Sequence, residues 1–264
     1  MSVDLTDLEA AGLDLAISGG VATVTLNRPQ HRNAMTPSMW HGLARIPGML
    51  TDDVRVVVVA AEGPSFCAGI DLRMFTAEGV PGEDRALSPA DPGFDDEVAR
   101  YQAGFRWLRD PSFVSIAAVR GHAIGAGFQL ALACDLRVLA DDAKLCMKEP
   151  ALGLVPDLTG TKPLVDIVGL PRAIELCLTA RTVDAAEAER LRLAERVVPA
   201  ADLDAAVAEL AAALMASDAA AARATKALLG HAQRRTLSEQ AAAERAAQAK
   251  LLQARLPDQQ AQQR

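Results

Sequence analysis

The stretches SFCAGIDL, at Ser65–Leu72, and GHAIGAGFQ, at Gly121–Gln129, decide the fold of this chain. Each follows a run rich in β-branched residues, Val54–Val59 before the first and Val114–Val119 before the second. Such runs predict buried strands, and the small residues after them predict turns that open helices. Turns of this kind leave backbone N–H groups unpaired and directed outward. Two converging turns would form an oxyanion hole, which stabilises a developing negative charge.

A third feature lies downstream, where Glu149 is followed by the pair Gly153-Leu154. This feature and the two stretches, which lie in this order about fifty residues apart, resemble the crotonase superfamily, the enoyl-CoA hydratase/isomerase family. The resemblance covers about Leu13 to about Leu252. It implies an α/β fold, in which a crotonase-like spiral of ββα units precedes a helical C-terminal region.

The resemblance also implies a binding site for an acyl-CoA thioester. In the family, the peptide N–H groups at the positions of Ala68 and Ala126 bind the thioester oxygen. Arg28 and Arg32 lie in a segment similar to the family's turn near the CoA pocket, and Lys226 resembles a C-terminal lysine that meets CoA phosphates. For each of these three charges, a solvated surface position is the competing interpretation. The residues implied in CoA binding are Arg28, Arg32, Ala68, Ile70, Asp71, Leu72 and Lys226.

The same resemblance divides the chain into two regions. Residues 1–200 are expected to form the spiral core with the CoA-thioester site, and residues 201–264 a helical region for trimerisation or for covering the site. Family members form trimers that often pair into hexamers, so we expect a homotrimer or a dimer of trimers. Alanine-rich amphipathic helices after Asp202 agree with burial against another surface.

Composition excludes several other classes of protein. The formal charge of −7 over 264 residues argues against a nucleic-acid-binding protein, which normally has a basic face. It leaves CoA binding open, because a few local Lys or Arg side chains can hold its phosphates. The sequence has no apolar run of about 20 residues and no basic-then-apolar N-terminal segment. We therefore expect a cytoplasmic protein without a membrane partner.

The cysteines give no sign of a metal site. Cys67, Cys134, Cys146 and Cys177 are isolated from one another, without the spacing of zinc ligands. Buried, reduced thiols are the expected state. We expect no bound metal and no cofactor, since the coenzyme A is part of the substrate.

Hydrophobic periodicity predicts strands that alternate with helices, which implies right-handed parallel crossovers. Leu13–Ser18 and Val21–Leu26 should be two strands joined by a tight Gly19-Gly20 turn. Thr36 should cap a helix, and Thr76–Asp96, rich in Gly, Pro and Asp, should be a surface loop. The remaining expected elements are strands at 54–60, 114–119, 136–140 and 144–147, and helices at 126–133, 202–216, 218–229 and 236–255.

The acidic residues bear on the chemistry. Family hydratases use two glutamates, which correspond by resemblance to Gln129 and Glu149. An amide can orient a water molecule through hydrogen bonds, but it cannot accept the proton of that water. General acid–base catalysis contributes roughly 10²–10⁴-fold per group, so hydration should be strongly weakened. Glu149 alone can still move a proton between two carbons, and family enoyl-CoA isomerases with only this glutamate are known.

Asp157, eight residues after Glu149, is a candidate second acid. Family dienoyl-CoA isomerases resemble this stretch and have an acidic residue at the position of Asp157, but they also keep an aspartate where Gln129 stands here. A helix N-cap is an equally good interpretation of Asp157. Asp71 is better explained as an N-cap or first-turn acid. Gln129 is also open to a structural role.

Three functional hypotheses follow. The first is double-bond isomerisation of an enoyl- or dienoyl-CoA, with Glu149 as the base, Asp157 as a candidate second acid and Gln129 as a further candidate site residue. The second is hydration of a 2-enoyl-CoA to a 3-hydroxyacyl-CoA, with water held by Gln129. The third is an acyl-CoA-binding protein that has lost catalysis, which the retained Glu149 argues against.

Overall fold

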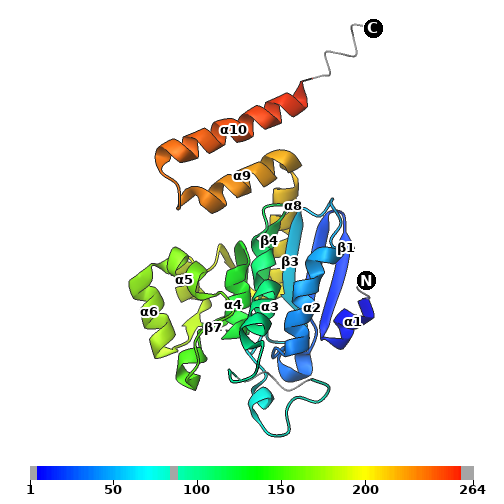
Figure 1. Ribbon diagram of the computed structural model, residues 1–264, viewed down its shortest axis with the longest axis vertical. Helices are drawn as coiled ribbons and strands as arrows, with labels where there is room; N and C mark the ends of the chain where they lie inside the picture. Colours follow the sequence, from blue (N-terminus) through cyan, green and yellow to red (C-terminus); the bar gives the residue numbers. More distant parts are fainter. Residues whose placement is uncertain (1–4, 84–88, 257–264) are drawn as a thin grey trace.

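The computed structural model describes residues 5–83 and 89–256 and contains two β-sheets surrounded by helices (Figure 1). The larger sheet has six strands in the order β1-β2-β3-β4-β6-β9. Its first pair is antiparallel and all later neighbours are parallel. The strands are β1 (Leu13–Ser18), β2 (Val21–Leu26), β3 (Val56–Ala61), β4 (Val114–Val119), β6 (Leu136–Ala140) and β9 (Arg196–Val198).

The valine-rich strand β3 is buried on both faces, which explains why its sequence does not alternate with polar residues. Val57 and Val59 belong to the main hydrophobic core. Val56 and Val58 point the other way, into a second cluster beneath helix α8 (Leu203–Met215). The sheet therefore forms a central layer, and the main core lies on the face opposite α8.

The smaller sheet brings the two small-residue turns together. Its strands are β5 (His122–Ile124), β7 (Lys144–Cys146) and β8 (Val183–Asp184), in that order. Isolated parallel bridges join Cys67 to Ala123 and Met35 to Ile70. The extended segment Cys67–Ile70 is thus held between β5 on one side and the chain at Met35 on the other.

Ten α-helices and six 3₁₀ turns complete the described part of the chain. The helices not yet given are α1 (Leu5–Ala10), α2 (Pro37–Arg45), α3 (Phe94–Arg106), α4 (Ala126–Ala133), α5 (Thr161–Val168), α6 (Leu170–Thr179), α7 (Ala185–Arg190), α9 (Ala219–Ala232) and α10 (Leu237–Arg255). The 3₁₀ turns are η1 (Pro29–His31), η2 (Ile46–Met49), η3 (Leu72–Phe75), η4 (Trp107–Arg109), η5 (Glu149–Leu152) and η6 (Ala200–Asp202).

Most of the expected elements are confirmed, including both strands of the first hairpin and the Thr36 cap, whose side chain accepts a bond from the Met39 N–H. Three expectations need correction. The first small-residue turn opens only the short η3, and strand β5 was not expected. Helix α3 begins at Phe94, inside the expected loop, of which residues 84–88 lie outside the described residues. No single described helix is long and apolar enough to span a membrane, although Ala200–Met215 and Ala219–Ala232 would qualify together across a 103° bend.

Helices α9 and α10 form a hairpin that stands away from the body of the molecule (Figure 1). Neither helix contains a buried residue, whereas α8, from the same predicted region, packs on the sheet. The placement of this hairpin against a neighbouring subunit stays a prediction.

Lys226 attaches the hairpin to the core. Its ammonium donates to the carbonyl oxygens of Asp110 and Phe113, both at 2.6 Å, and pairs with the Asp135 carboxylate at 2.6 Å. It also lies 5.3 Å from the centre of the Phe113 ring. These three acceptors match the three N–H donors of the ammonium, so a CoA phosphate would have to displace one of them. The predicted CoA contact of Lys226 has no support from this geometry.

Replacing Lys226 with Met should loosen α9 selectively, because three bonds between the hairpin and the core disappear. Each bond to a charged group contributes about 1.5–3 kcal/mol. We therefore expect amide hydrogen exchange in α9 to accelerate at least tenfold, measured by mass spectrometry. Lys162→Met is the matched control, because Lys162 is exposed and its ion pair within residues 5–83 and 89–256 is with Asp166 on its own helix. Unchanged exchange in α9 would show that Lys226 does not anchor the hairpin.

Candidate active site

A cavity of about 420 Å³ lies where the two small-residue turns meet. It is bounded by the η1 loop, by the segment that follows Cys67, by the start of α4 and by η5. The lining combines backbone of the two turns, two buried carboxyl groups and several basic side chains. The lining residues are His31, Ala34, Ala68, Gly69, Ile70, Asp71, Leu72, Arg73, Ile124, Gly125, Ala126, Lys148, Glu149, Leu152 and Leu154.

The backbone of the first turn corrects the prediction for Ala68. Its N–H donates to the Arg32 carbonyl oxygen at 2.9 Å and is therefore not available to a ligand. Along the bridge to Met35, the Gly69 carbonyl and the Asp71 N–H both point toward that residue, at 2.8 Å each. The N–H of Ile70, between them, points to the opposite side. Ile70 supplies the unpaired donor, because no acceptor in the described residues binds its N–H.

The second turn presents a similar donor at the first residue of α4. Gly125 is the N-cap, with φ of 51°, a conformation that glycine adopts readily. Its own N–H donates to the Cys146 carbonyl at 2.8 Å. The next N–H, that of Ala126, is at the helix N-terminus and has no acceptor among the residues described. Its position agrees with the predicted donor, while binding of a thioester oxygen stays a prediction.

Glu149, on η5, places its carboxyl group beside the second turn. The residue is only 8% exposed. An added Cβ at Gly125 would lie 3.1 Å from Glu149 Oε1 and 3.5 Å from Oε2, so the carboxyl group covers this glycine. Oε1 accepts a hydrogen bond of 2.6 Å from Gln129 Nε2. Oε2 is buried and has no partner among the described residues.

The environment of Glu149 favours its protonated form. Burial raises the pKa of this carboxyl group, and the nearby Asp157 carboxylate raises it further, against the opposing effect of the Gln129 hydrogen bond. A carboxyl group with a raised pKa can accept a proton near neutral pH and return it. This combination of burial and an orphan oxygen marks Glu149 as the candidate acid–base group.

Gln129 has a different place from the one predicted. It is 1% exposed and is not among the residues that line the cavity. Its side-chain oxygen accepts bonds from the N–H groups of Leu158, at 2.9 Å, and Gly160, at 3.1 Å. Its side-chain nitrogen faces Glu149. This geometry gives no support to the predicted contact with substrate or water, which stays a prediction, and it agrees with the structural interpretation of Gln129.

Asp157 is exposed and does not line the cavity. Partial burial of its carboxyl group raises its pKa, and it acts on Glu149 through its charge. The N-cap interpretation of Asp157 is wrong, because α5 begins after Gly160 without a side-chain cap. The role of Asp157 as a second acid stays a prediction.

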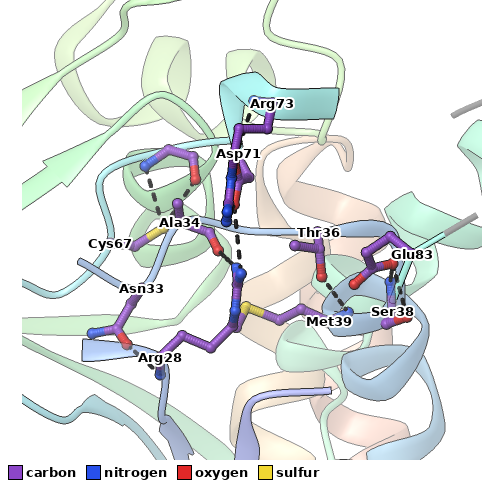
Figure 2. Close-up of polar contacts among 11 residues, drawn as sticks. Arg28, Asn33, Ala34, Thr36, Ser38, Met39, Cys67, Asp71, Arg73 and Glu83 are labelled. Atoms are coloured by element: carbon purple, nitrogen blue, oxygen red, sulfur yellow. Dashed lines mark hydrogen bonds and ion pairs between the residues drawn. The ribbon is translucent and has the colours of Figure 1, made fainter. Parts of the chain in front are cut away.

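Asp71 organises the charges beside the first turn (Figure 2). Its carboxylate caps η3 by accepting from the Arg73 N–H at 3.2 Å, and it pairs with the Arg73 guanidinium at 2.7 Å. The hydrogen bonds from Arg73 hold the pKa of Asp71 at about 2. Arg28 lies 3.5 Å from the same carboxylate and also donates to the Ala34 carbonyl. Arg28 is therefore turned into the chain and does not line the cavity.

Three basic side chains at the cavity were not predicted from the sequence as part of the site. They are His31, Arg73 and Lys148. Arg73 directly follows the segment assigned to CoA, but its direction depends on Asp71, which no sequence pattern specifies. Arg32 is exposed and is not part of the lining.

Comparisons with known proteins agree with this geometry. Residues 16–256 match the model of the family described as enoyl-CoA hydratase/isomerase. A Mycobacterium bovis protein named "Probable enoyl-CoA hydratase echA8" is 35% identical over 83% of this chain and 81% of its own length. The mitochondrial Delta(3,5)-Delta(2,4)-dienoyl-CoA isomerase of Dictyostelium discoideum is 31% identical over 89% of this chain and 81% of its own length.

Among solved structures, a Thermobifida fusca YX protein assigned as an enoyl-CoA hydratase was crystallised in complex with acetoacetyl-CoA. It superposes with a TM-score of 0.93 and is 61% identical, over 97% of this chain and 100% of that chain. A similarity of this extent covers the spiral core, the cavity and the C-terminal helices together.

The raised pKa of Glu149 predicts a cost to stability. Because the folded state holds this proton more tightly than the unfolded chain, the fold loses stability as pH rises from the unfolded pKa, about 4.3, through the raised folded value. Glu149→Gln cannot ionise and should melt a few °C higher at pH 8. The difference should disappear near pH 4. Thermal melts across this range test it, and a lower Tm of the variant at pH 8 would contradict it.

Proposed function

This chain belongs to the enoyl-CoA hydratase/isomerase family, and we propose that it shifts the double bond of an unsaturated acyl-CoA thioester through an enolate. One observation carries the proposal: the buried carboxyl group of Glu149, which has an oxygen without a partner among the described residues, lines a cavity that also presents two unpaired backbone N–H groups. The donors, from Ile70 and Ala126, would hold the thioester oxygen, and Glu149 would be the base.

The proton balance of this reaction needs only one acid–base group. Glu149 removes a proton from the carbon next to the double bond, and the electron pair moves into the thioester carbonyl. The two N–H groups stabilise the resulting dienolate oxygen, a contribution that is worth about 10²–10³-fold per donor in oxyanion holes. The protonated Glu149 then returns its proton to another carbon. Proton and double bond change place, and nothing is added or lost.

Isomerisation is favoured over hydration because, of the two carboxyl groups that line the cavity, only that of Glu149 has a raised pKa. Asp71 is paired with Arg73, and its pKa is held at about 2. Hydration needs a group that accepts the proton of water, and an amide cannot do this. Gln129, moreover, directs its N–H toward Glu149 and its oxygen toward two backbone amides. Since Asp157 does not line the cavity, the proposal depends on Glu149 alone.

Relatives support the substrate class and leave the reaction open. The names of the two relatives include both a hydratase and a dienoyl-CoA isomerase. The T. fusca protein was crystallised with acetoacetyl-CoA, which is itself an acyl-CoA thioester. In this proposal the coenzyme A belongs to the substrate, and Arg73 and Lys148 are the cavity-lining cations that would meet its phosphates, with His31 beside them. The homotrimer or hexamer and the cytoplasmic location stay predictions.

The test follows protons by mass spectrometry. A medium-chain 3-enoyl-CoA incubated with the protein in deuterated water should become the 2-enoyl-CoA with deuterium on carbon and without a gain of water. Glu149→Gln should slow this conversion by about 10²–10⁴-fold, because it removes the carboxyl group that the proposal assigns as the base. Glu189→Gln, on the exposed side of α7, is the matched control and should convert at the native rate.

Other outcomes would redirect the assignment. Gain of a whole water by a 2-enoyl-CoA would support the hydratase hypothesis and overturn the isomerase. Thioester binding with neither deuterium uptake nor conversion to the 2-enoyl-CoA would indicate a non-catalytic acyl-CoA-binding protein. Substantial turnover by Glu149→Gln would remove Glu149 from the role of base.

A further inference from the structure

Gln129 is held in one orientation by groups that cannot change their hydrogen-bonding character. The N–H groups of Leu158 and Gly160 are donors only, so the side-chain atom that faces both of them must be the amide oxygen. The amide nitrogen is thereby directed at Glu149 Oε1, 2.6 Å away. Because Gln129 is 1% exposed, water does not compete for these bonds.

Two glycines allow the Gln129 amide and the Glu149 carboxyl group to pack closely against the backbone. A Cβ at Gly160 would lie 2.5 Å from Gln129 Cγ, and a Cβ at Gly125 would lie 3.1 Å from Glu149 Oε1. The amide is packed against one glycine and the carboxyl group against the other. Rotation of either side chain therefore meets backbone.

We propose that Gln129 is a positioning residue, which binds Oε1 of Glu149 and so makes Oε2 the oxygen that exchanges a proton with the substrate. This inference rests on the proposed function, in which Glu149 is the base. Oε2 is the atom without a partner in the described residues, and a proton taken from substrate carbon forms the Oε2–H bond. The same bond breaks when the proton is delivered to the other carbon.

A neutral amide at position 129 also has an electrostatic role. A second carboxylate there would stand 2.6 Å from Glu149 Oε1, and two like charges at that distance share one proton. The shared proton would then prevent Glu149 from accepting a substrate proton over the pH range in which it must act as a base. The amide avoids this competition and still donates a hydrogen bond.

Other titratable groups surround Glu149 and bear on its pH dependence. Asp157 lies on the turn before α5 and raises the pKa of Glu149. Cys146 at the end of β7 and Cys177 on α6 both sense its charge, and their pKa values are raised by burial. Lys148 precedes it in the chain and lines the cavity. No side chain of these four residues hydrogen bonds to the Glu149 carboxyl oxygens in the described structure, whereas that of Gln129 does.

The test is the pH dependence of deuterium exchange into an acyl-CoA. Gln129→Glu keeps the side-chain size and an acceptor for Leu158 and Gly160, so it should fold. The pH at which exchange is half-maximal should rise by about one unit or more, since the new carboxyl group shares a proton with Glu149. At pH 6 the exchange rate should fall at least tenfold, while KM for the thioester changes less than twofold. Gln248→Glu, the same change on exposed α10, should leave the profile unchanged.

A second variant displaces Gln129 without changing its chemistry. Gly160→Ala introduces a methyl group against Gln129 Cγ and should lower kcat at least tenfold with little effect on KM. A native pH profile in Gln129→Glu, or native kcat in Gly160→Ala, would overturn the positioning role.

A readout that does not need turnover separates this inference from the proposed function. The Glu149 carboxyl carbon, labelled with ¹³C and assigned by its loss in Glu149→Gln, can be titrated by NMR. A higher pKa of Glu149 in Gln129→Glu supports the positioning role even if the protein exchanges no substrate proton, in which case the proposed function alone fails. An unchanged titration would overturn the positioning role even if isomerisation is observed.

Discussion

The extended segment from Cys67 to Asp71 is hydrogen bonded on both sides, and the cavity depends on this constraint. On one side the Cys67 N–H donates to the His122 carbonyl at 2.8 Å, and on the other the Asp71 N–H donates to the Met35 carbonyl at 2.8 Å. A segment paired in this way cannot rotate its peptide groups. The Ile70 N–H is therefore directed away from Met35, at the cavity that the start of α4 also borders. Pre-oriented donors of this kind need no reorganisation when charge develops beside them.

Electrostatics and packing act in opposite directions at Glu149. Burial of a carboxyl group with an oxygen that has no partner destabilises the folded state in which Glu149 is ionised. The same burial raises the pKa of Glu149, which makes it a more effective proton acceptor and donor near neutral pH. The surrounding structure tolerates this cost because Gln129, Leu158 and Gly160 form a fully bonded group on one side of the carboxyl. The burial that destabilises the fold around Glu149 is thus the same burial that raises its pKa for the proposed proton transfer.

Charged side chains that look alike in the sequence have different tasks in the fold. Arg28 and Lys226 bind backbone carbonyls and carboxylates of their own chain. Arg73 pairs with Asp71 and reaches the cavity. Because long cationic side chains can satisfy either internal carbonyls or ligand phosphates, their spacing along the chain does not distinguish the two tasks.

The sequence by itself determined most strands of the larger sheet and their parallel crossovers, because β-branched runs that alternate with helical segments have few other physical solutions. The two small-residue turns and Glu149 indicated the family through their resemblance to its motifs. The short strands β5 and β8 of the smaller sheet were not expected. The sequence also indicated Glu149 as the candidate base, because by resemblance this residue stands where family members have a catalytic glutamate, and the structure places Glu149 at the cavity. Only the tertiary structure decided that the donor is Ile70 instead of Ala68, because successive N–H groups of an extended segment point in opposite directions and a shift of one residue exchanges them. The task of Gln129, the exposed position of Asp157 and the internal bonds of Lys226 were likewise decided by partners far away in the chain. No local pattern specifies such partners, since they depend on which segments the fold brings side by side.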